Sequence, residues 1–281
     1  MNKFNLFWPV YKNLEKELLQ IADYIHFADD QTKVYSMHIA DLIVRCSIEI
    51  EAISKELYLD IGGTSVPIDA NGNGRDLYFD TDCLDLLENR WGVSKKQVIV
   101  SATTFYFSSE TNRILAPLRK ASKRGTSGSK WKQAYQAVKH NRKSSLKMAS
   151  IENLLHAMGA LYILNLYYKD EIFDIGRVYM GNKEFDNRVG SDVFSVFNYN
   201  ATSLSMAVRM DDSCIAQQPD NDLDKSIYIV KYDDKSFKEM HKNFCLDNES
   251  ASNNFKNSPE IIGFLKQNPD YKVEMSSPGY N

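Results

Sequence analysis

Several features that mark common protein classes are missing from the sequence. No apolar run approaches the roughly 20 residues that a membrane-spanning helix requires, so we expect no membrane partner. The most apolar stretch, residues 154–168, is shorter and predicts a buried core helix. The N-terminus lacks an apolar region followed by a small-residue cleavage site, so we expect no secretory signal. No G-x-G-x-x-G, Walker A or G-x-S-x-G sequence occurs, which argues against common nucleotide-cofactor enzymes and serine hydrolases, and we expect no cofactor.

Cysteine is also scarce. The chain has four cysteines, and none stands at the C-x-x-C spacing of zinc and redox sites. They are Cys46, Cys83, Cys214 and Cys245. Scattered cysteines of this kind favour free thiols in a reducing compartment, so we expect a cytoplasmic protein. We assign no metal to the histidines either, because none has a partner at metal-ligand spacing.

Acidic residues are missing from one stretch of the chain. Between Asn112 and Ile151 the sequence has eleven Lys or Arg residues and no Asp or Glu. The eleven are Arg113, Arg119, Lys120, Lys123, Arg124, Lys130, Lys132, Lys139, Arg142, Lys143 and Lys147. The rest of the chain has 23 basic and 37 acidic residues, although the formal net charge of the whole chain is only −3. A basic segment on an acidic protein is typical of a surface that binds a polyanion. The alternative is pairing with acidic patches of the same chain or of a partner subunit, and both interpretations remain open.

Apolar periodicity predicts four long helices. The first two, at about residues 5–30 and 34–58, are joined by a short polar turn and start an antiparallel bundle. Two more follow at about 130–142 and 146–169, and the last is apolar on more than one side, as a central bundle helix should be. Residues 1–170 are therefore expected to form an antiparallel helical domain.

The segments between and after these helices have a different composition. Residues 60–110 are rich in turn signals and β-branched residues, which predicts a β-containing insertion with a hairpin and a short helix near 82–91. Residues 113–130 form a basic loop, and we expect its Gly/Ser-rich part to be mobile. Residues 171–281 combine strand-like and short helical patterns. The predicted fold class is therefore mainly α, a helical bundle with a β-containing insertion and a smaller α+β C-terminal extension.

The segment from Asp69 to Asp80 partly fits a calcium-binding loop. Asp69, Asn71 and Asn73 stand at the first, third and fifth positions, Gly74 at the sixth and Asp80 at the twelfth. The twelfth position normally supplies a bidentate Glu, however, and the flanks are strand-like rather than helical. Because Asn-Gly pairs are also the strongest hairpin signal, we favour a plain hairpin turn and keep a calcium loop as the alternative.

The stretch from Lys130 to Arg142 concentrates aromatic and basic residues on one helix. Its aromatic side chains form a stripe that faces the core, and lysines form the neighbouring stripe. With His140 as general base and Arg142 and Lys139 contacting phosphate, this helix would supply what metal-independent RNA cleavage requires. On a regular helix, however, His140 and Arg142 point about 200° apart, so they share a site only if the helix ends there or a dimer adds a second copy. The alternative is a solvated basic face with no active site.

Residues 131–142 resemble a motif in one branch of the HEPN superfamily. The sequence W-K-Q-A-Y-Q-A-V-K-H-N-R, followed by the Ala-rich helix of residues 148–164, resembles a W-x-x-Y-N-x-V-K-H-x-R pattern that precedes a helix rich in Ala, Asn and Leu. Residues 47–58 are similar to the E-x-x-x-K pattern of those proteins, and I-L-A-P-L at residues 114–118 stands where they often have Thr-Pro. The resemblance covers about residues 5–170.

The resemblance implies a HEPN-like bundle of four or five helices, usually dimeric and cytoplasmic. Such proteins are common in bacterial toxin–antitoxin, abortive-infection and other phage-defence systems. Active members are metal-independent endoribonucleases with an R-x(4–6)-H motif, whose two copies meet across the dimer, whereas others serve as binding or dimerisation modules. In this sequence no arginine stands five to seven residues before His140; Arg142 follows it, and Arg45 is the other available arginine.

We therefore hypothesise a HEPN-like RNA-binding protein of bacterial defence or stress response, and keep metal-independent endoribonuclease activity as an open question. His140, Arg142 and Lys139 would carry catalysis, and Glu49 and Arg45 would support them. The expected RNA contacts are Arg119, Lys120, Lys123, Arg124, Lys130, Lys132 and Lys143. The alternative is a non-catalytic interaction or dimerisation module that binds nucleic acid or an acidic partner protein. Both hypotheses include a homodimer, with an antitoxin or another defence protein as a further partner.

Overall fold

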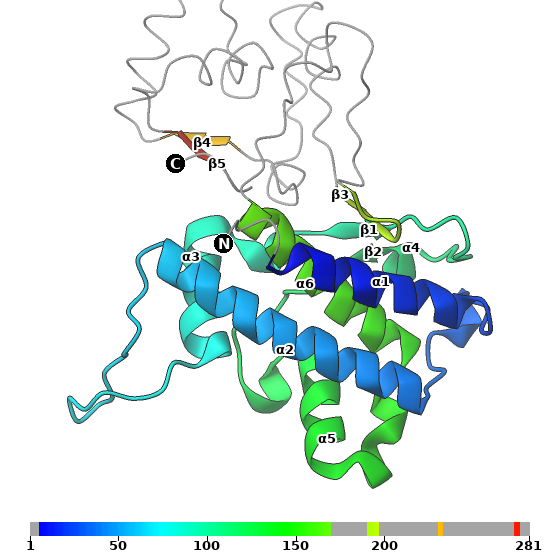
Figure 1. Cartoon of the computed structure of the whole chain (residues 1–281), viewed down its shortest axis with the longest axis horizontal. Coiled ribbons are helices and arrows are strands. Elements are labelled where there is room, and N and C mark those ends of the chain that lie inside the picture. Colours follow the sequence, from blue (N-terminus) through cyan, green and yellow to red (C-terminus); the bar gives the residue numbers. More distant parts are fainter. Residues whose placement is uncertain (1–5, 170–189, 197–229, 233–272, 276–281) are drawn as a thin grey trace, which may run out of the picture. The chain divides into compact units, whose positions relative to one another are not determined.

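The computed structural model describes residues 6–169, 190–196, 230–232 and 273–275 (Figure 1). The chain divides into two units, one made of Met1–Lys169 and Arg188–Phe197 and the other of Asp170–Asn187 and Asn198–Asn281. The first unit therefore holds the helical domain and also a short later segment. Its described part is mainly helical with a small antiparallel sheet, which confirms the predicted mainly-α class with a β-containing part.

The first two helices form an antiparallel pair (Figure 1). α1 covers Trp8–Ala22 and has Pro9 in its first turn, and α2 covers Met37–Asp60. α1 ends earlier than the periodicity predicts, because the chain turns after Ala22 and forms a short 3-10 helix at Asp29–Gln31. α2 begins at Met37 because the Ser36 side chain accepts a hydrogen bond from the Ile39 N–H.

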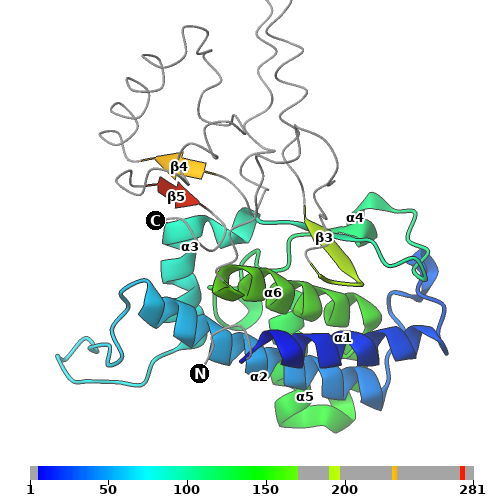
Figure 2. The same cartoon turned by 45° about the horizontal axis from the view of Figure 1, so that its top comes forward.

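The central helix is α6, Ile151–Lys169, which packs against α1, α2 and α5, Lys130–Ser145. Its side chains are buried on almost every side, which explains why its sequence has no single apolar stripe. The sheet lies on one side of the bundle and α5 lies on the opposite side (Figures 1 and 2).

The small sheet draws its strands from three separate parts of the sequence. β1, Val98–Val100, pairs antiparallel with β2, Ile114–Leu115, and with β3, Phe194–Val196. β1 is much shorter than the strand-like composition around it suggests. The sheet packs on α6 at Gly159, where a Cβ atom would lie 3.2 Å from the Val98 side chain. A larger residue at this position would press against the Val98 side chain.

Besides the turn in which Ile68 pairs with Gly74, the rest of the insertion consists of loops and short helices. It contains a π-helix at Phe79–Leu84, α3 at Asp85–Trp91 and α4 at Glu110–Arg113. The π-helix and α3 together correspond to the short helix that the sequence places near 82–91. Both lie close to α2, and they bring residues 77–80 beside its middle turns.

A buried carboxylate attaches the later segment to the helical unit. Glu15 of α1 accepts hydrogen bonds from the Tyr11 hydroxyl at 2.8 Å and from the backbone N–H groups of Asp192 and Val193 at 3.0 and 3.2 Å. The Ser191 hydroxyl donates to the same oxygen. Because the carboxylate replaces its lost water with these donors, β3 is held beside α1 through a polar contact that the sequence pattern does not show.

The C-terminal unit is described at one strand pair. β4, Val230–Tyr232, pairs antiparallel with β5, Val273–Met275. The short helices predicted for this extension lie outside the described residues. Among the residues that the structure describes, no helix combines the length and apolar character needed to cross a membrane.

Candidate functional site

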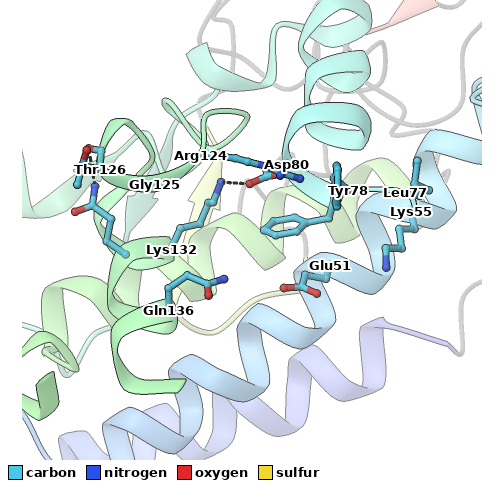
Figure 3. A pocket seen from close by; sticks show the side chains of 12 residues that line it. Glu51, Lys55, Leu77, Tyr78, Asp80, Arg124, Gly125, Thr126, Lys132 and Gln136 are labelled. Carbon is cyan, nitrogen blue, oxygen red and sulfur yellow. Dashed lines mark hydrogen bonds and ion pairs between the residues drawn. The ribbon is translucent and has the colours of Figure 1, made fainter. Parts of the chain in front are cut away.

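A pocket of about 630 Å³ lies at the foot of the basic loop, between α2 and α5 (Figure 3). Glu51 and Lys55 of α2 form one wall, and residues 77–80 form the next. Residues 124–126 of the basic loop and residues 132–136 of α5 complete it. The pocket therefore joins four separate segments of the chain.

The floor of the pocket is a buried ion pair between Lys132 and Asp80. The Lys132 Nζ donates to Asp80 Oδ2 at 3.1 Å and to the carbonyl oxygens of Ala121 and Lys123 at 2.6 and 2.7 Å. Three acceptors use all three donors of the ammonium group. The Arg124 Nε donates to the other oxygen of Asp80 at 3.1 Å. Lys132 is thus a structural residue that ties the basic loop to α5 and to the π-helix.

Burial and the charge of the partner have opposite effects on the pKa of Asp80 and on that of Lys132. Burial acts to raise the pKa of Asp80, but the charge and hydrogen bond of Lys132, with smaller help from the Thr81 N–H and Arg124, hold that pKa below its usual value. Burial lowers the pKa of Lys132, and Asp80 offsets only part of this effect. The pair therefore keeps a carboxylate charged in the floor of the pocket.

The backbone of the basic loop is hydrogen-bonded to side chains of α5. The Gln133 Nε2 donates to the carbonyls of Thr126 and Gly128 at 3.1 and 2.9 Å, in addition to the two loop carbonyls bound by Lys132. A Cβ atom at Gly128 would lie 2.8 Å from the Lys123 carbonyl, so only glycine fits this turn. The composition could not reveal this, because the groups that hold the loop belong to α5.

Two arginine guanidinium groups lie against the ring of Tyr78 at the rim of the pocket. The Arg124 guanidinium carbon lies 3.7 Å from the ring centroid, and that of Arg75 lies 4.8 Å away. Arg75 in turn makes a bidentate pair with Asp82, at 2.7 Å for both bonds. Arg124 is therefore aligned both by the Asp80 carboxylate and by stacking on Tyr78.

Three polar side chains on the α2 and α5 walls of the pocket are unpaired. Among the described residues, neither Glu51 nor Lys55 of α2 makes a hydrogen bond or ion pair, and the same is true of the Gln136 side chain of α5. Glu51 and Gln136 extend toward each other across the pocket (Figure 3). These groups are available to a ligand.

The cationic residues predicted to contact RNA differ in their exposure and pairing. Lys132 is buried in the floor and is not available to an external phosphate, which corrects the sequence-based assignment. Arg119, Lys120, Lys123 and Lys143 are exposed, and their side chains make no hydrogen bond or ion pair within the described ranges. Lys130 is exposed and pairs with Glu152 at 3.5 Å, while Arg124 is half-exposed above Asp80.

The helix that carries His140 is broken directly after it. Asn141 has φ −146° and ψ 68°, which is not helical, so α5 consists of two pieces joined at this residue. His140 and Arg142 lie on either side of the break and are exposed, and Lys139 contacts the Tyr135 hydroxyl at 3.4 Å. The 200° separation expected on a regular helix therefore does not apply to His140 and Arg142.

Of the two supporting residues proposed on α2, Arg45 is engaged elsewhere. Arg45 pairs with Glu17 of α1 at 2.7 Å and with Asp41 at 3.8 Å. Burial raises the pKa of Glu49, and the charge of Arg45 counteracts this. The structure shows no hydrogen bond or ion pair between these two residues and His140 among the residues it describes.

The four residues of the calcium alternative do not converge on one site. Asp69 accepts hydrogen bonds from the N–H groups of Asn71 and Asn73 at 2.9 and 2.8 Å, and Ile68 pairs with Gly74, as in a hairpin turn. Asp80 is instead bound to Lys132 in the pocket floor. In the described ranges, no three His, Cys, Asp or Glu side chains are grouped as a metal site would require.

Comparison of the chain with protein-family models, curated proteins and solved structures found no match. The assignment of function therefore rests on the residues themselves. Sequence reasoning missed the pocket residues Tyr78, Phe79 and Gln136. The only signal for Glu51 and Lys55 was the E-x-x-x-K pattern, which places two opposite charges one turn apart on a helix.

Proposed function

We propose that this protein binds RNA through a basic surface formed by Arg119, Lys120 and Lys123 of the loop and by Arg142 and Lys143 of α5. The observation that carries the proposal is that these five side chains are exposed and unpaired within the described part of the chain. Unpaired cations without nearby acids attract phosphates, and releasing the counterions of RNA drives binding. Among the described residues, no acid pairs with any of these five side chains.

The hydrogen bonds between the loop and α5 support this proposal. Lys132 and Gln133 hold the loop backbone against α5 through four hydrogen bonds to carbonyl groups. These bonds reduce the ordering of the loop backbone that RNA binding would require, which lowers the entropic cost of the complex. We place this activity in the cytoplasm and, following the resemblance, in bacterial defence or stress response.

Salt dependence tests the proposal directly. Binding of a fluorescein-labelled single-stranded RNA should weaken as salt rises, with a slope of about −0.7 per phosphate contact. In the variant Arg119→Gln/Lys120→Gln/Lys123→Gln, the slope should become shallower by about two. The variant Lys16→Gln, an exposed α1 lysine without an ion pair in the described residues, serves as the charge control. Binding that ignores salt, or an equal loss in the control, would show that phosphate contacts are not the basis of affinity.

Endonucleolytic cleavage is the second candidate function, and the break at Asn141 is the observation that favours it. Because the break lies between His140 and Arg142, the two side chains are not constrained to opposite sides of a helix. His140 would accept the 2′-hydroxyl proton, and Arg142 and Lys139 would stabilise charge on the phosphate. A homodimer would supply a second copy of these groups.

Cleavage of labelled RNA in the presence of EDTA tests this second candidate. His140→Ala should abolish cleavage while leaving RNA binding within a factor of about three, since His140 supplies proton transfer rather than most of the phosphate contacts. Unchanged cleavage in His140→Ala would exclude the assigned base. Absence of cleavage in the wild-type chain would leave the non-catalytic RNA-binding function.

A further inference from the structure

The pocket between α2 and the basic loop is lined by polar side chains that have no partner among the described residues. We propose that this pocket binds a guanine nucleotide, and that it does so as part of a single-stranded RNA held on the basic surface. This inference rests on the proposed RNA-binding function and adds base selectivity to it. None of the pocket groups used below was predicted to contact RNA, except Arg124.

Glu51 is the group that decides selectivity. Its carboxylate is partly buried in the pocket wall and has no hydrogen bond or ion pair within the described residues. A partly buried carboxylate in a pocket is best satisfied by a ligand that offers two donors side by side, because its two oxygens accept in a bidentate manner. Guanine offers this pair, in its adjacent N1–H and exocyclic N2–H groups.

The other bases present a different edge to a carboxylate. Adenine and cytosine each place a ring nitrogen with a lone pair beside their amino group, and uracil flanks its single N–H with two carbonyl oxygens. Each of these acceptors would be repelled by Glu51. A carboxylate placed to accept from two donors therefore disfavours bases that lack them, because its oxygens would be left without hydrogen bonds. An apolar pocket could not discriminate as strongly.

Gln136 supplies the matching donor for the third atom of the guanine edge. Its side chain extends toward Glu51 from the opposite wall, and its amide is unpaired in the described residues (Figure 3). An amide N–H can donate to guanine O6 while Glu51 accepts from the neighbouring N1–H and N2–H. Recognition of an unstacked base by its Watson–Crick edge is the usual way in which proteins read single-stranded RNA.

The remaining walls suit the rest of a nucleotide. Leu77 and Phe79 provide apolar surface for the faces of the base. The Arg124 guanidinium uses its Nε for Asp80, which leaves its terminal nitrogens for a phosphate at the rim. The exposed Lys123 and Lys120 continue the cationic surface away from the pocket along the loop. A guanine in the pocket would thus place its backbone on the basic surface.

Binding of short RNAs to the full chain tests this inference. Labelled single-stranded octamers of adenosine carry one central G, A, C or U, and free 5′-GMP and 5′-AMP compete in separate titrations. The wild-type chain should bind the G octamer about tenfold more tightly than the others. In Glu51→Gln this preference should disappear while the affinity for the all-A octamer stays the same.

Two further variants separate the site from general effects. Glu56→Gln removes an exposed acid from the same helix outside the pocket and should keep the full preference. Gln136→Ala, at an exposed position that the fold tolerates, should reduce the preference even if Glu51→Gln is unstable.

The outcomes distinguish this inference from the function on which it rests. RNA binding without base preference, or a G preference that persists in both Glu51→Gln and Gln136→Ala, would overturn the guanine site alone. No RNA binding together with GMP binding that depends on Glu51 would support the guanine site and overturn the RNA-binding function. No binding of any RNA or nucleotide would overturn both.

Discussion

Replacing Lys132 by Met tests whether one buried ammonium group holds the loop, the π-helix and α5 together. Methionine keeps most of the length of the side chain but removes its charge and its three hydrogen bonds to Asp80, Ala121 and Lys123. Removing one partner of a buried ion pair costs about 3–5 kcal/mol, because the other charge stays buried. Arg124 still contacts Asp80 from the exposed side, so the lower end of this range applies. We expect the free energy of unfolding to fall by about 3 kcal/mol.

Chemical denaturation followed by tryptophan fluorescence measures this change in the helical unit. All three tryptophans of the chain, Trp8, Trp91 and Trp131, belong to that unit, and Trp131 is the neighbour of Lys132 in sequence. The matched control is Lys130→Met on the same helix, which removes an exposed charge and should change stability by about 0.5 kcal/mol or less.

The pH dependence of the same experiment gives a second criterion. Because the folded-state pKa of Asp80 is lowered, its stabilisation is complete above the usual pKa of an Asp side chain, about 3.9, and is lost as the pH falls through the folded value. The stability curves of wild type and Lys132→Met should therefore converge in acid. A loss below about 1 kcal/mol at neutral pH, or a loss equal to that of Lys130→Met, would refute the structural role of Lys132.

Three other measurements address separate features. In thermal denaturation, Gly128→Ala should lower the unfolding free energy by about 1–3 kcal/mol, because the new methyl group meets the Lys123 carbonyl. The control Thr126→Ala changes an exposed side chain and should melt like wild type. The Arg45 hydrogen bond lowers the pKa of Glu17, so wild type has a stabilisation of about 0.5 kcal/mol above the usual Glu pKa and loses it in acid. Glu17→Gln should lack this stabilisation. If the unfolding free energies of the two proteins fell equally as the pH is lowered, the role of Glu17 would be contradicted. Burial raises the pKa of Cys83 to about 12 and that of Cys46 further, so mass spectrometry should find both thiols unalkylated by iodoacetamide until urea unfolds the chain.

The sequence predicts the long helices because their apolar residues recur with the period of a helix. α2, α5 and α6 lie close to their predicted positions, and Ser36 and Pro9 stand where helix starts require them. Periodicity did not predict where β1 ends or that β3 completes the sheet, because a three-residue strand has no period to detect. β3 depends on the buried Glu15 carboxylate, which sequence reasoning treats as an ordinary polar position on α1.

For the candidate site, too, the sequence predicts the charge, whereas the tertiary structure decides the contacts. The excess of positive charge in residues 112–151 was evident from the sequence, but the separate roles of its members were not. Lys132 and Lys130 stand two positions apart on one helix, and only packing shows that the first is buried against Asp80 while the second faces solvent. The break at Asn141 was equally hidden, because neither a glycine nor a proline marks it.

The sequence by itself determined the fold class and the charge of the surface, because helical period and net charge are sums over neighbouring residues. Tertiary structure alone decided which cations are free and which polar groups share a pocket. Glu51, Asp80, Arg124 and Gln136 come from four separate segments, and the Lys132 contacts hold two of those segments against α5. Such contacts depend on how the chain closes in space, so no local pattern could have shown that a carboxylate and an amide face each other there.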